Sequence, residues 1–331
     1  MKFVRCAAVA AVVGLAVPAQ ANDSSATLGA GGLMLTTTAD IRMASEDLFI
    51  SPKQIRIRYE FTNDASKDLD LLVAFPLPDI DAYEFFEEPL GTVTADPLNF
   101  VNFQVKQDGR PVTVQMEQRA FFQNKDVTAI VKKAGVPINA VHPKYGQSLD
   151  KLPKAQMAAL VKAGIAEMEG DYLHPRWTAR TKFFWKQHFP AGKTIVLEQT
   201  YQPVTGQAFF SQYDLKADDK SEDDMYWKKT YCIDKNTQST LARMIKARSS
   251  KGSNDAAPGL LVSYATDYIL KTANNWKGPI GKFHMTLDKL KPANVLSLCW
   301  DGDLKKTGAT RFEFTRDNFA PAQDVKLVVI E

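Results

Sequence analysis

The chain has 331 residues, of which 45% are hydrophobic and 24% are charged, which is an ordinary globular composition. This length allows about two domains with cores of their own, and the composition excludes general disorder. The formal net charge of +3 is too small to draw the chain to nucleic acid or to an anionic membrane surface, so neither is expected as a partner.

Residues 1–21 are typical of a signal peptide. Lys2 and Arg5 make a basic start, an apolar run follows, and a small-residue cleavage pattern ends at Ala21. The apolar run is shorter than the roughly 20 residues of a membrane-spanning helix, and no later segment is long and apolar enough to span a bilayer. We therefore expect export to the periplasm, cleavage before Asn22, and a mature chain without a transmembrane segment.

Period-two patterns, and the lack of alternating strands and helices, predict a mainly β fold with two sandwich-like domains. The first is expected over residues 22–205 and carries a small helical insertion near residues 124–171. The second is expected over residues 206–331 and contains one helix near residues 236–247. An acidic stretch from Asp214 to Asp224 is expected to be an exposed loop at the boundary.

Six segments of the first domain alternate polar and apolar residues, and turn residues join them into three expected hairpins. The paired segments are 54–61 with 69–75, 103–106 with 112–116, and 183–189 with 194–201. The glycine-rich stretch at residues 29–32 lacks the spacing and the flanking helix of a phosphate-binding loop, so a lead-in segment or strand is expected there.

Within the insertion the apolar period becomes helical. A short helix is expected from Asp126 to Ala134, before Gly135, and a clearer one begins near Pro153. The apolar face of the second helix consists of Met157, Leu160, Val161, Ile165 and Met168, although Gly164 would end this helix early.

The second domain begins with the helix near residues 236–247, whose buried face is expected to hold Leu241, Met244 and Ile245. Five strands follow. They are expected at residues 260–270, 282–287, 295–300, 310–315 and 325–330.

The mature chain keeps two cysteines, Cys232 and Cys299, because Cys6 leaves with the signal peptide. Two thiols in an oxidising compartment most often pair, so we expect a disulfide between them. A redox-active or metal-binding pair is the alternative, but neither cysteine has a CxxC partner or a nearby histidine.

Several stretches of the chain resemble an uncharacterised bacterial family, domain of unknown function 4424. The stretches are Asn22 to Ser25, Leu28 to Leu33, Ser45 to Pro52, Phe75 to Asp81, Phe189 to Gly192 and Trp276 to Phe283. The resemblance covers nearly the whole mature chain and implies an exported protein of Gram-negative bacteria. It implies no activity, cofactor or catalytic residue.

The sequence contains no GxSxG, HExxH or complete β-lactamase motif set, which disfavours a nucleophilic enzyme. A triad assembled from distant residues stays open. No cofactor is predicted. A divalent metal ion is the one cofactor left open. His142 and His174 flank the insertion, and they would meet near Glu167, Glu169 and Asp171 if the two ends of the insertion approach each other. The alternative is that both histidines are solvated turn residues.

Binding candidates come from carboxylates and aromatic residues. Asp79 and Asp81 follow a strand and are either a calcium or acid-base pair or ordinary charged turn residues. Phe184, Trp276 and Trp300 are either exposed platforms for sugars and partner proteins or core residues.

These patterns favour a non-catalytic periplasmic binding or envelope-associated module that meets an envelope protein or a polysaccharide. The alternative is an envelope hydrolase or a metal-dependent enzyme that uses the carboxylate loops or the histidine pair.

Overall fold

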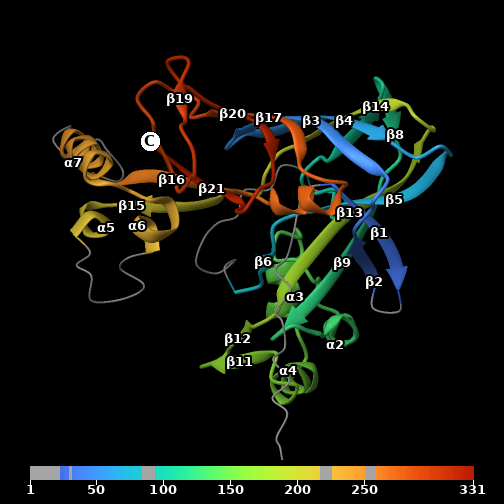
Figure 1. Ribbon diagram of the computed structural model, residues 1–331. Coiled ribbons are helices and arrows are strands. Elements are labelled where there is room, and N and C mark those ends of the chain that lie inside the picture. Colours follow the sequence, from blue (N-terminus) through green and yellow to red (C-terminus); the bar gives the residue numbers. More distant parts are fainter. Residues whose placement is uncertain (1–22, 30–31, 84–93, 95, 217–225, 250–257) are drawn as a thin grey trace, which may run out of the picture.

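The computed structural model describes residues 23–29, 32–83, 94, 96–216, 226–249 and 258–331. The fold is mainly β, as predicted, and two large antiparallel-rich sheets form its centre (Figure 1). The expected signal peptide and most of the expected acidic loop lie outside the described residues.

The described part of the chain forms four sheets. The seven-stranded sheet contains β1 (Ser24–Gly29), β2 (Gly32–Thr36), β5 (Leu69–Pro76), β6 (Ile80–Asp81), β9 (Gln115–Phe122), β10 (Lys125–Asp126) and β13 (Thr178–Phe189). The eight-stranded sheet contains β3 (Ile41–Ser51), β4 (Gln54–Asn63), β7 (Gln104–Gln107), β8 (Arg110–Val112), β14 (Thr194–Tyr201), β17 (Ile280–Asp288), β19 (Lys305–Lys306) and β20 (Arg311–Phe319). The four-stranded sheet contains β15 (Gly206–Phe210), β16 (Leu261–Tyr268), β18 (Val295–Leu298) and β21 (Val325–Ile330), and the two-stranded sheet contains β11 (Ala166–Glu169) and β12 (Tyr172–Pro175).

The helices lie in two groups and one connecting turn. They are α2 (Thr128–Ala134), α3 (Tyr145–Asp150) and α4 (Lys154–Lys162) in the insertion, and α5 (Gln212–Lys216), α6 (Tyr226–Tyr231) and α7 (Lys235–Ser249) beside the four-stranded sheet, with the 3-10 helix η1 (Lys271–Asn275) between β16 and β17.

The two large sheets share one aromatic core. Along β4 and β13 every second side chain is buried, which is the pattern of a strand with one face on a core. Phe103 stacks on Phe75 with ring centroids 5.0 Å apart and on Phe183 at 4.6 Å. Phe61 of the eight-stranded sheet meets Phe189 of the seven-stranded sheet edge to face at 6.1 Å. The two sheets therefore form a sandwich.

Two of the three expected hairpins are wrong, although their strands are present. β4 pairs with β3 and β14, whereas β5 pairs with β1 and β13 in the opposite sheet, and β13 and β14 are separated in the same way. An alternating pattern shows that a strand has one apolar face. Two consecutive strands can bury such faces either by pairing in one sheet or by lying in opposite sheets across the core, so the pattern does not distinguish these arrangements. The third hairpin is confirmed as β7 and β8, but its return strand ends at Val112, and Met116 lies in β9 of the other sheet.

Asn63 holds the two connections that cross between the sheets. Its Nδ2 donates hydrogen bonds of 2.9 Å to the carbonyl oxygens of Lys67 and Phe189, and its backbone N–H donates to the carbonyl of Lys193 at 3.0 Å. Asn63 is fully buried, so these bonds satisfy a polar group that would otherwise cost free energy. One side chain thus fixes both crossovers.

The structure does not confirm a division into two sandwiches at residue 206. β17 lies parallel to β3, with Lys282 opposite Ser45 and Leu287 opposite Ile50, and β20 and β19 continue the same sheet. A parallel pair requires a long crossover connection, and here it spans most of the chain. The sandwich is therefore closed by strands from beyond the expected boundary.

The four-stranded sheet is covered on both faces. Val325, Leu327 and Val329 of β21 join the main core, whereas Val328 and Ile330 pack toward α6 and α7. This two-sided burial explains why β21 is apolar along most of its length. The helix predicted near residues 236–247 is confirmed as α7 and buries Leu241 and Ile245.

The insertion leaves the sandwich after β10 and returns at β13, two strands of the same sheet. Trp177 is fully buried and its Nε1 donates to the Ile138 carbonyl at 2.8 Å, and the Tyr145 hydroxyl donates to the Ala82 carbonyl at 3.2 Å. Helix α4 ends before Gly164, which has a φ of +72°. The expected apolar face is therefore only partly correct.

That helix buries Leu160, while Val161 is 37% exposed. Ile165 is buried beyond its end, and Met168 lies in β11 with 44% exposure.

A β-bulge in β3 sets which side chains of that strand face the core. The register with β4 shifts between Met43 and Ser45, so Glu46, rather than its neighbours, points inward. Opposite the bulge, a Cβ added to Gly281 would lie 2.5 Å from the Ala44 carbonyl oxygen. Glycine at 281 therefore permits the bulge.

Replacing Gly281 with alanine is expected to lower the free energy of unfolding by about 2 kcal/mol or more, because the new methyl group collides with backbone that cannot move freely. Urea unfolding of Gly281→Ala measures this change. Gly308→Ala is the matched control, since a Cβ there meets only the Cβ of Arg311 at 3.9 Å. Equal stability of both variants would contradict the role given to Gly281.

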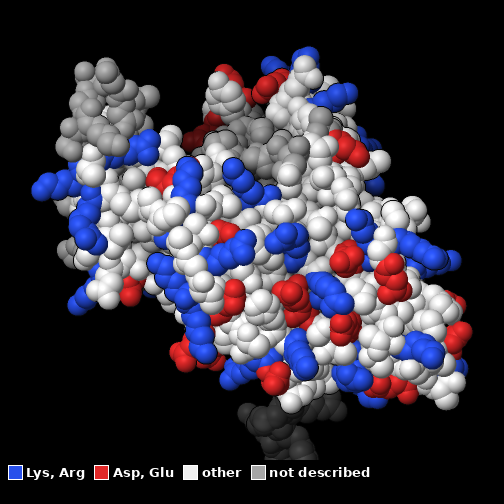
Figure 2. Space-filling model, turned by 90° about the horizontal axis from the view of Figure 1, so that it is seen from above, with Lys and Arg blue, Asp and Glu red and all other residues white. Residues whose placement is uncertain are grey.

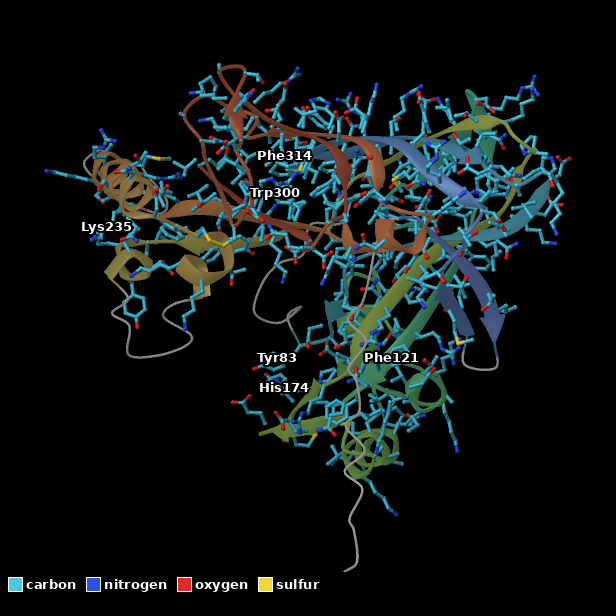
Figure 3. The ribbon with its side chains drawn as sticks, in the orientation of Figure 1. Tyr83, Phe121, His174, Lys235, Trp300 and Phe314 are labelled. Atoms are coloured by element: carbon cyan, nitrogen blue, oxygen red, sulfur yellow. A yellow bond between two sulfur atoms is a disulfide. The ribbon has the colours of Figure 1, made fainter. Side chains whose placement is uncertain are left out.

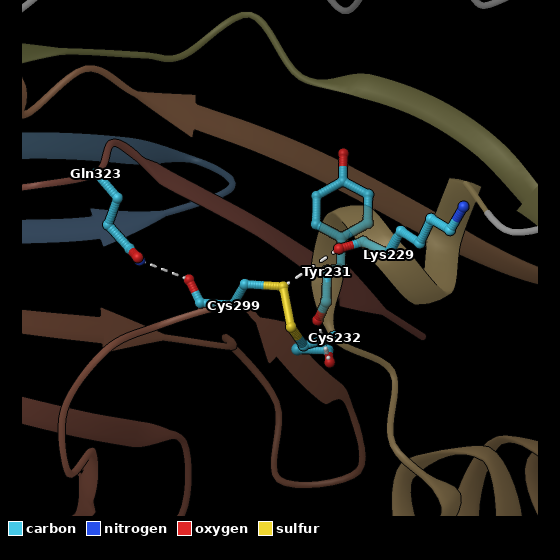
Figure 4. The surroundings of a disulfide bond; sticks show 6 residues. Lys229, Tyr231, Cys232, Cys299 and Gln323 are labelled. Atoms are coloured by element: carbon cyan, nitrogen blue, oxygen red, sulfur yellow. Dashed lines mark hydrogen bonds between the residues drawn. A yellow bond between two sulfur atoms is a disulfide. The ribbon is translucent and has the colours of Figure 1, made fainter. Parts of the chain in front are cut away.

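The predicted disulfide between Cys232 and Cys299 is confirmed (Figure 4). It joins the end of α6 to the segment after β18, with a sequence separation of 67. The Gln323 amide donates to the Cys299 carbonyl at 2.8 Å, and the Ser297 hydroxyl donates to the Tyr231 carbonyl at 2.8 Å. These bonds fix the two ends of the bridge against the four-stranded sheet.

Reducing this disulfide is expected to lower the free energy of unfolding by roughly 4 kcal/mol, because a closed loop of this length restricts the unfolded chain. Chemical unfolding with and without a phosphine reductant measures the loss. The doubly substituted chain, Cys232→Ser with Cys299→Ser, should match the reduced protein and should not respond to reductant. A reductant effect in that variant would assign the loss to another cause.

Candidate functional site

A cleft of about 470 Å³ opens in the insertion, between its helices and the β11–β12 hairpin. We call it the insertion cleft; its lining residues are Leu149, Asp150, Met157, Glu169, Asp171, Tyr172, Leu173 and His174. A volume in this range is typical of sites for small ligands. Figure 3 shows Tyr83 and His174 close together at the hairpin end of the insertion.

The hairpin places its polar side chains on one face. In the antiparallel register Glu169 lies opposite Tyr172 and Glu167 opposite His174, and residues opposite each other share a face. Gly170 occupies the turn with a φ of +61°, a conformation that glycine adopts without strain. Tyr172 is 73% exposed at the rim of the insertion cleft.

His174 is the most enclosed polar residue of the insertion cleft, with 16% of its side chain exposed. Its Nε2 lies 3.4 Å from Oε2 of Glu169, and its ring centroid is 5.3 Å from that of Tyr83. The imidazole is thus held between a carboxylate and an aromatic ring.

The insertion cleft is acidic at its rim and apolar at its base. Asp150, Glu169 and Asp171 contribute three carboxylates, and no lysine or arginine is among the lining residues. Leu149 and Leu173 are each 5% exposed and form the apolar part. Such a site offers hydrogen-bond acceptors around a surface that an apolar or ring-shaped group can cover.

The structure does not place His142 in the insertion cleft with His174. The Nδ1 of His142 instead accepts a hydrogen bond from the backbone N–H of Lys144 at 3.1 Å, in the turn before α3. Burial, and then the Lys144 charge, lower the pKa of His142. Within the described ranges, no three His, Cys, Asp or Glu residues are grouped as metal ligands.

Asp79 and Asp81 have different surroundings. Nε of Arg180 donates to Oδ2 of Asp79 at 3.0 Å, and the same guanidinium lies 4.3 Å from the centroid of the Phe121 ring, labelled in Figure 3. Oδ1 of Asp81 accepts a hydrogen bond from the backbone N–H of Tyr83 at 2.8 Å. Asp81 thereby shapes the turn that carries Tyr83 toward His174.

The three aromatic candidates pack within the protein. Trp276 is 3% exposed, and its Nε1 donates to the Asp23 carbonyl at 2.6 Å. Trp300 is half-buried against Phe314, with ring centroids 5.2 Å apart (Figure 3). Phe184 is half-buried and packs with a small cluster of Ala26, Leu33 and Ala74 under the β1–β2 hairpin.

The outer face of the eight-stranded sheet carries a second, shallower hollow of about 350 Å³. Figure 2 looks down on this face and shows acidic and basic side chains interspersed. Nδ1 of His284 lies 3.0 Å from Asp47, Nε of Arg311 lies 3.2 Å from Asp288, and the Arg56 guanidinium lies 4.2 Å from the Phe49 ring centroid. The charged side chains of this hollow thus largely partner one another.

Sequence reasoning found His174, Glu169 and Asp171 but missed Tyr172 and Tyr83. The signal for Tyr172 is the segment Glu169 to Tyr172, in which a glycine turn joins two short alternating segments. Tyr83 carried no signal, because its approach to His174 depends on how the insertion folds back on β6.

The profile of a family described as Domain of unknown function (DUF4424) matches residues 21–328. The chain belongs to this family. Among solved structures, the DUF4424 protein is similar to a Legionella pneumophila chain described as a "putative nutrient binding protein". The two are 15% identical with a TM-score of 0.44, and the alignment covers 93% of this chain and 72% of that chain. A comparison with curated proteins gives no match.

In the described part of the DUF4424 protein, no helix is both long enough and apolar enough to cross a membrane.

Burial raises the pKa of Asp79 above its ordinary value of 3.8, against the opposing effect of Arg180. A pKa that is higher in the folded than in the unfolded state favours the protonated carboxyl in the folded protein. The contribution of Asp79 to the free energy of unfolding is therefore fully present below the unfolded pKa and is lost as the pH rises through the folded pKa. We therefore expect Asp79→Asn to gain stability relative to the natural protein as the pH rises above about 4.

Urea unfolding of both proteins across this pH range measures the difference. Asp68→Asn is the control, since the Asp68 side chain is 60% exposed. If the natural protein instead became more stable than Asp79→Asn as the pH rises, the Arg180 ion pair would outweigh the effect of burial on the Asp79 carboxyl.

Proposed function

We propose that this DUF4424 protein is an exported, non-catalytic binding module whose insertion cleft holds a saccharide unit of an envelope polysaccharide. The observation that carries the proposal is the combination, in one cleft, of an exposed tyrosine ring with three carboxylates and an apolar base.

Saccharides match this combination chemically. The faces of a sugar ring carry C–H groups that pack on an aromatic ring, and the hydroxyl groups around its edge are hydrogen-bond donors. Tyr172, 73% exposed, presents such a ring at the rim. Carboxylates at Asp150, Glu169 and Asp171 accept hydrogen bonds and donate none when ionised, so they suit a ligand edged with hydroxyl groups.

Three further features support an exported protein. Residues 1–21 have the composition of a signal peptide, the family match begins at residue 21, and Cys232 and Cys299 form a disulfide. Disulfides form and persist in oxidising compartments such as the periplasm. An envelope polysaccharide would therefore be within reach of the insertion cleft.

A glycan array that carries peptidoglycan fragments and lipopolysaccharide core oligosaccharides tests the proposal, with calorimetry on any glycan that binds. Tyr172→Ala is expected to weaken binding by about tenfold, because it removes the stacking surface. Glu169→Gln should weaken it as well, since an amide replaces a charged acceptor.

Tyr213→Ala is the matched control, because Tyr213 is a similarly exposed tyrosine, at 71%, on α5. It should bind as the natural protein does. An empty array, or equal losses in the Tyr172 and Tyr213 variants, would remove the support for a saccharide site in the insertion cleft.

A further inference from the structure

One short region of the chain carries a strong excess of positive charge. Over the whole sequence Lys and Arg number 41 against 38 Asp and Glu, so the charges nearly balance. Residues 226–249, which form α6, α7 and the turn between them, contain a single acid, Asp234. Their basic residues are Lys228, Lys229, Lys235, Arg243, Lys246 and Arg248. The small net charge of the chain therefore conceals an uneven distribution.

Asp234 serves as the cap of α7. Its Oδ1 accepts a hydrogen bond from the backbone N–H of Thr237 at 2.7 Å, and this bond lowers the pKa of the Asp234 carboxyl below its ordinary value. A carboxylate in this position satisfies a backbone donor that the first turn of a helix leaves open. Beyond this cap, α7 itself contains no acidic residue.

Three basic side chains of α7 lie on its solvent side. Leu241 and Ile245 are buried on the opposite side, in the apolar cluster between the helix and the four-stranded sheet. Lys235, Arg243 and Lys246 are exposed, and their spacing of two to three turns aligns them along one side of the helix. We call these three residues the basic face of α7. Its charges extend over about 16 Å of the helix axis.

Within the described part of the chain, the basic face of α7 has no acidic partner. The Arg243 side chain donates only within its own helix, from Nε to the Ser239 carbonyl at 3.4 Å and from Nη2 to the Thr240 hydroxyl at 3.2 Å. On the outer face of the eight-stranded sheet, by contrast, Arg and Lys alternate with acids and pair with them. The basic face thus presents charges of one sign to solvent.

α7 is also firmly attached at an end of the molecule. The disulfide at Cys232 lies just before the helix, and the Ser297 hydroxyl donates to the Tyr231 carbonyl. Figure 1 places α7 away from the insertion, and Figure 2 shows lysine and arginine side chains predominating at the end that α7 occupies. A partner that contacts the basic face therefore leaves the insertion cleft uncovered.

The composition of α7 narrows the class of partner. Protein interfaces are centred on buried apolar or aromatic anchors, and α7 carries none of the exposed large hydrophobic residues. Single-stranded nucleic acids stack their bases on aromatic side chains, and α7 contains no aromatic residue. The remaining attraction is that of a row of cations for a surface of anions. Anionic lipid head groups supply such a surface without requiring a fixed arrangement of charges.

We propose that the basic face of α7 docks the protein on an anionic phospholipid surface. The contact is electrostatic and shallow, because Leu241 and Ile245 already pack inside the protein. The net charge of the whole chain does not reveal it, since charges farther away than the Debye length of about 8 to 10 Å are screened. The inference goes beyond the saccharide site and does not depend on it.

Vesicle sedimentation at low ionic strength tests the inference, with the chain lacking residues 1–21 so that their apolar run cannot itself bind lipid. One set of vesicles holds equal parts of phosphatidylglycerol and phosphatidylcholine, and the other holds phosphatidylcholine alone. The protein is expected to bind only the anionic vesicles and to dissociate as salt is added, because salt screens the attraction.

The variant Lys235→Gln with Arg243→Gln and Lys246→Gln is expected to bind the anionic vesicles about a hundredfold more weakly, since each Lys or Arg near such a surface contributes about fivefold. Glutamine preserves the helix, because its helix propensity is close to that of lysine and arginine. Circular dichroism checks that the variant is folded. If it is not, the single variants Lys235→Gln and Lys246→Gln replace it, each with an expected loss of about fivefold.

The matched control removes the same charge from the insertion. Its changes are Lys125→Gln, Lys132→Gln and Lys133→Gln, at three exposed lysines. This variant should bind the anionic vesicles nearly as well as the natural protein. Equal weakening in the two triple variants would overturn the inference, because net charge rather than the basic face would then govern binding.

Two further outcomes would overturn the inference. One is the absence of binding to phosphatidylglycerol vesicles at low salt. The other is binding to lipopolysaccharide micelles without binding to these vesicles, which would assign the basic face to a phosphorylated glycolipid. On the glycan array the α7 triple variant should match the natural protein, so a failure of vesicle binding and a failure of saccharide binding are distinguished.

Discussion

The packing of the seven-stranded sheet against the eight-stranded sheet is the constraint on which the rest of the structure depends. The chain crosses from one sheet to the other between β4 and β5 and again between β13 and β14, and Asn63 holds both crossovers. Neither sheet is therefore complete without the other. β17 and β20 then close the eight-stranded sheet from the far end of the chain. Because distant segments share one aromatic core, the sandwich is expected to fold and unfold as a unit.

The insertion cleft is attached to this sandwich without interrupting it. The insertion begins and ends at strands of one sheet, and Trp177 and Tyr145 anchor it through buried hydrogen bonds. Its helices and hairpin therefore form a small layer of their own, and those of its side chains that do not pack on the sandwich line the cleft. A site on such an appendage can change its residues with little effect on the shared core, which suits a binding module on a rigid scaffold.

The sequence predicted where most strands lie but not how they pair. Alternation located β4, β5, β13 and β14, and Gly164 marked the end of α4, because these signals are local. The parallel pairing of β3 with β17 joins segments over 200 residues apart, and no local pattern encodes it. The same limit applies to the site: His174 and Glu169 were found as chemically suitable neighbours, whereas Tyr83 joins them only through the tertiary fold.

The β-bulge in β3 connects the fold with the buried acids. Without the extra residue near Ala44, the alternation that starts at Ile41 and Met43 would carry Ser45 and Asp47 inward and leave Glu46 in solvent. The bulge instead turns Glu46 toward Tyr268, and Gly281 leaves the space for it. Glu46 is thereby held inside the core, 1% exposed, where it accepts the Tyr268 hydroxyl rather than facing solvent. The register of the central sheet and the position of a buried carboxylate are thus set by the same bulge.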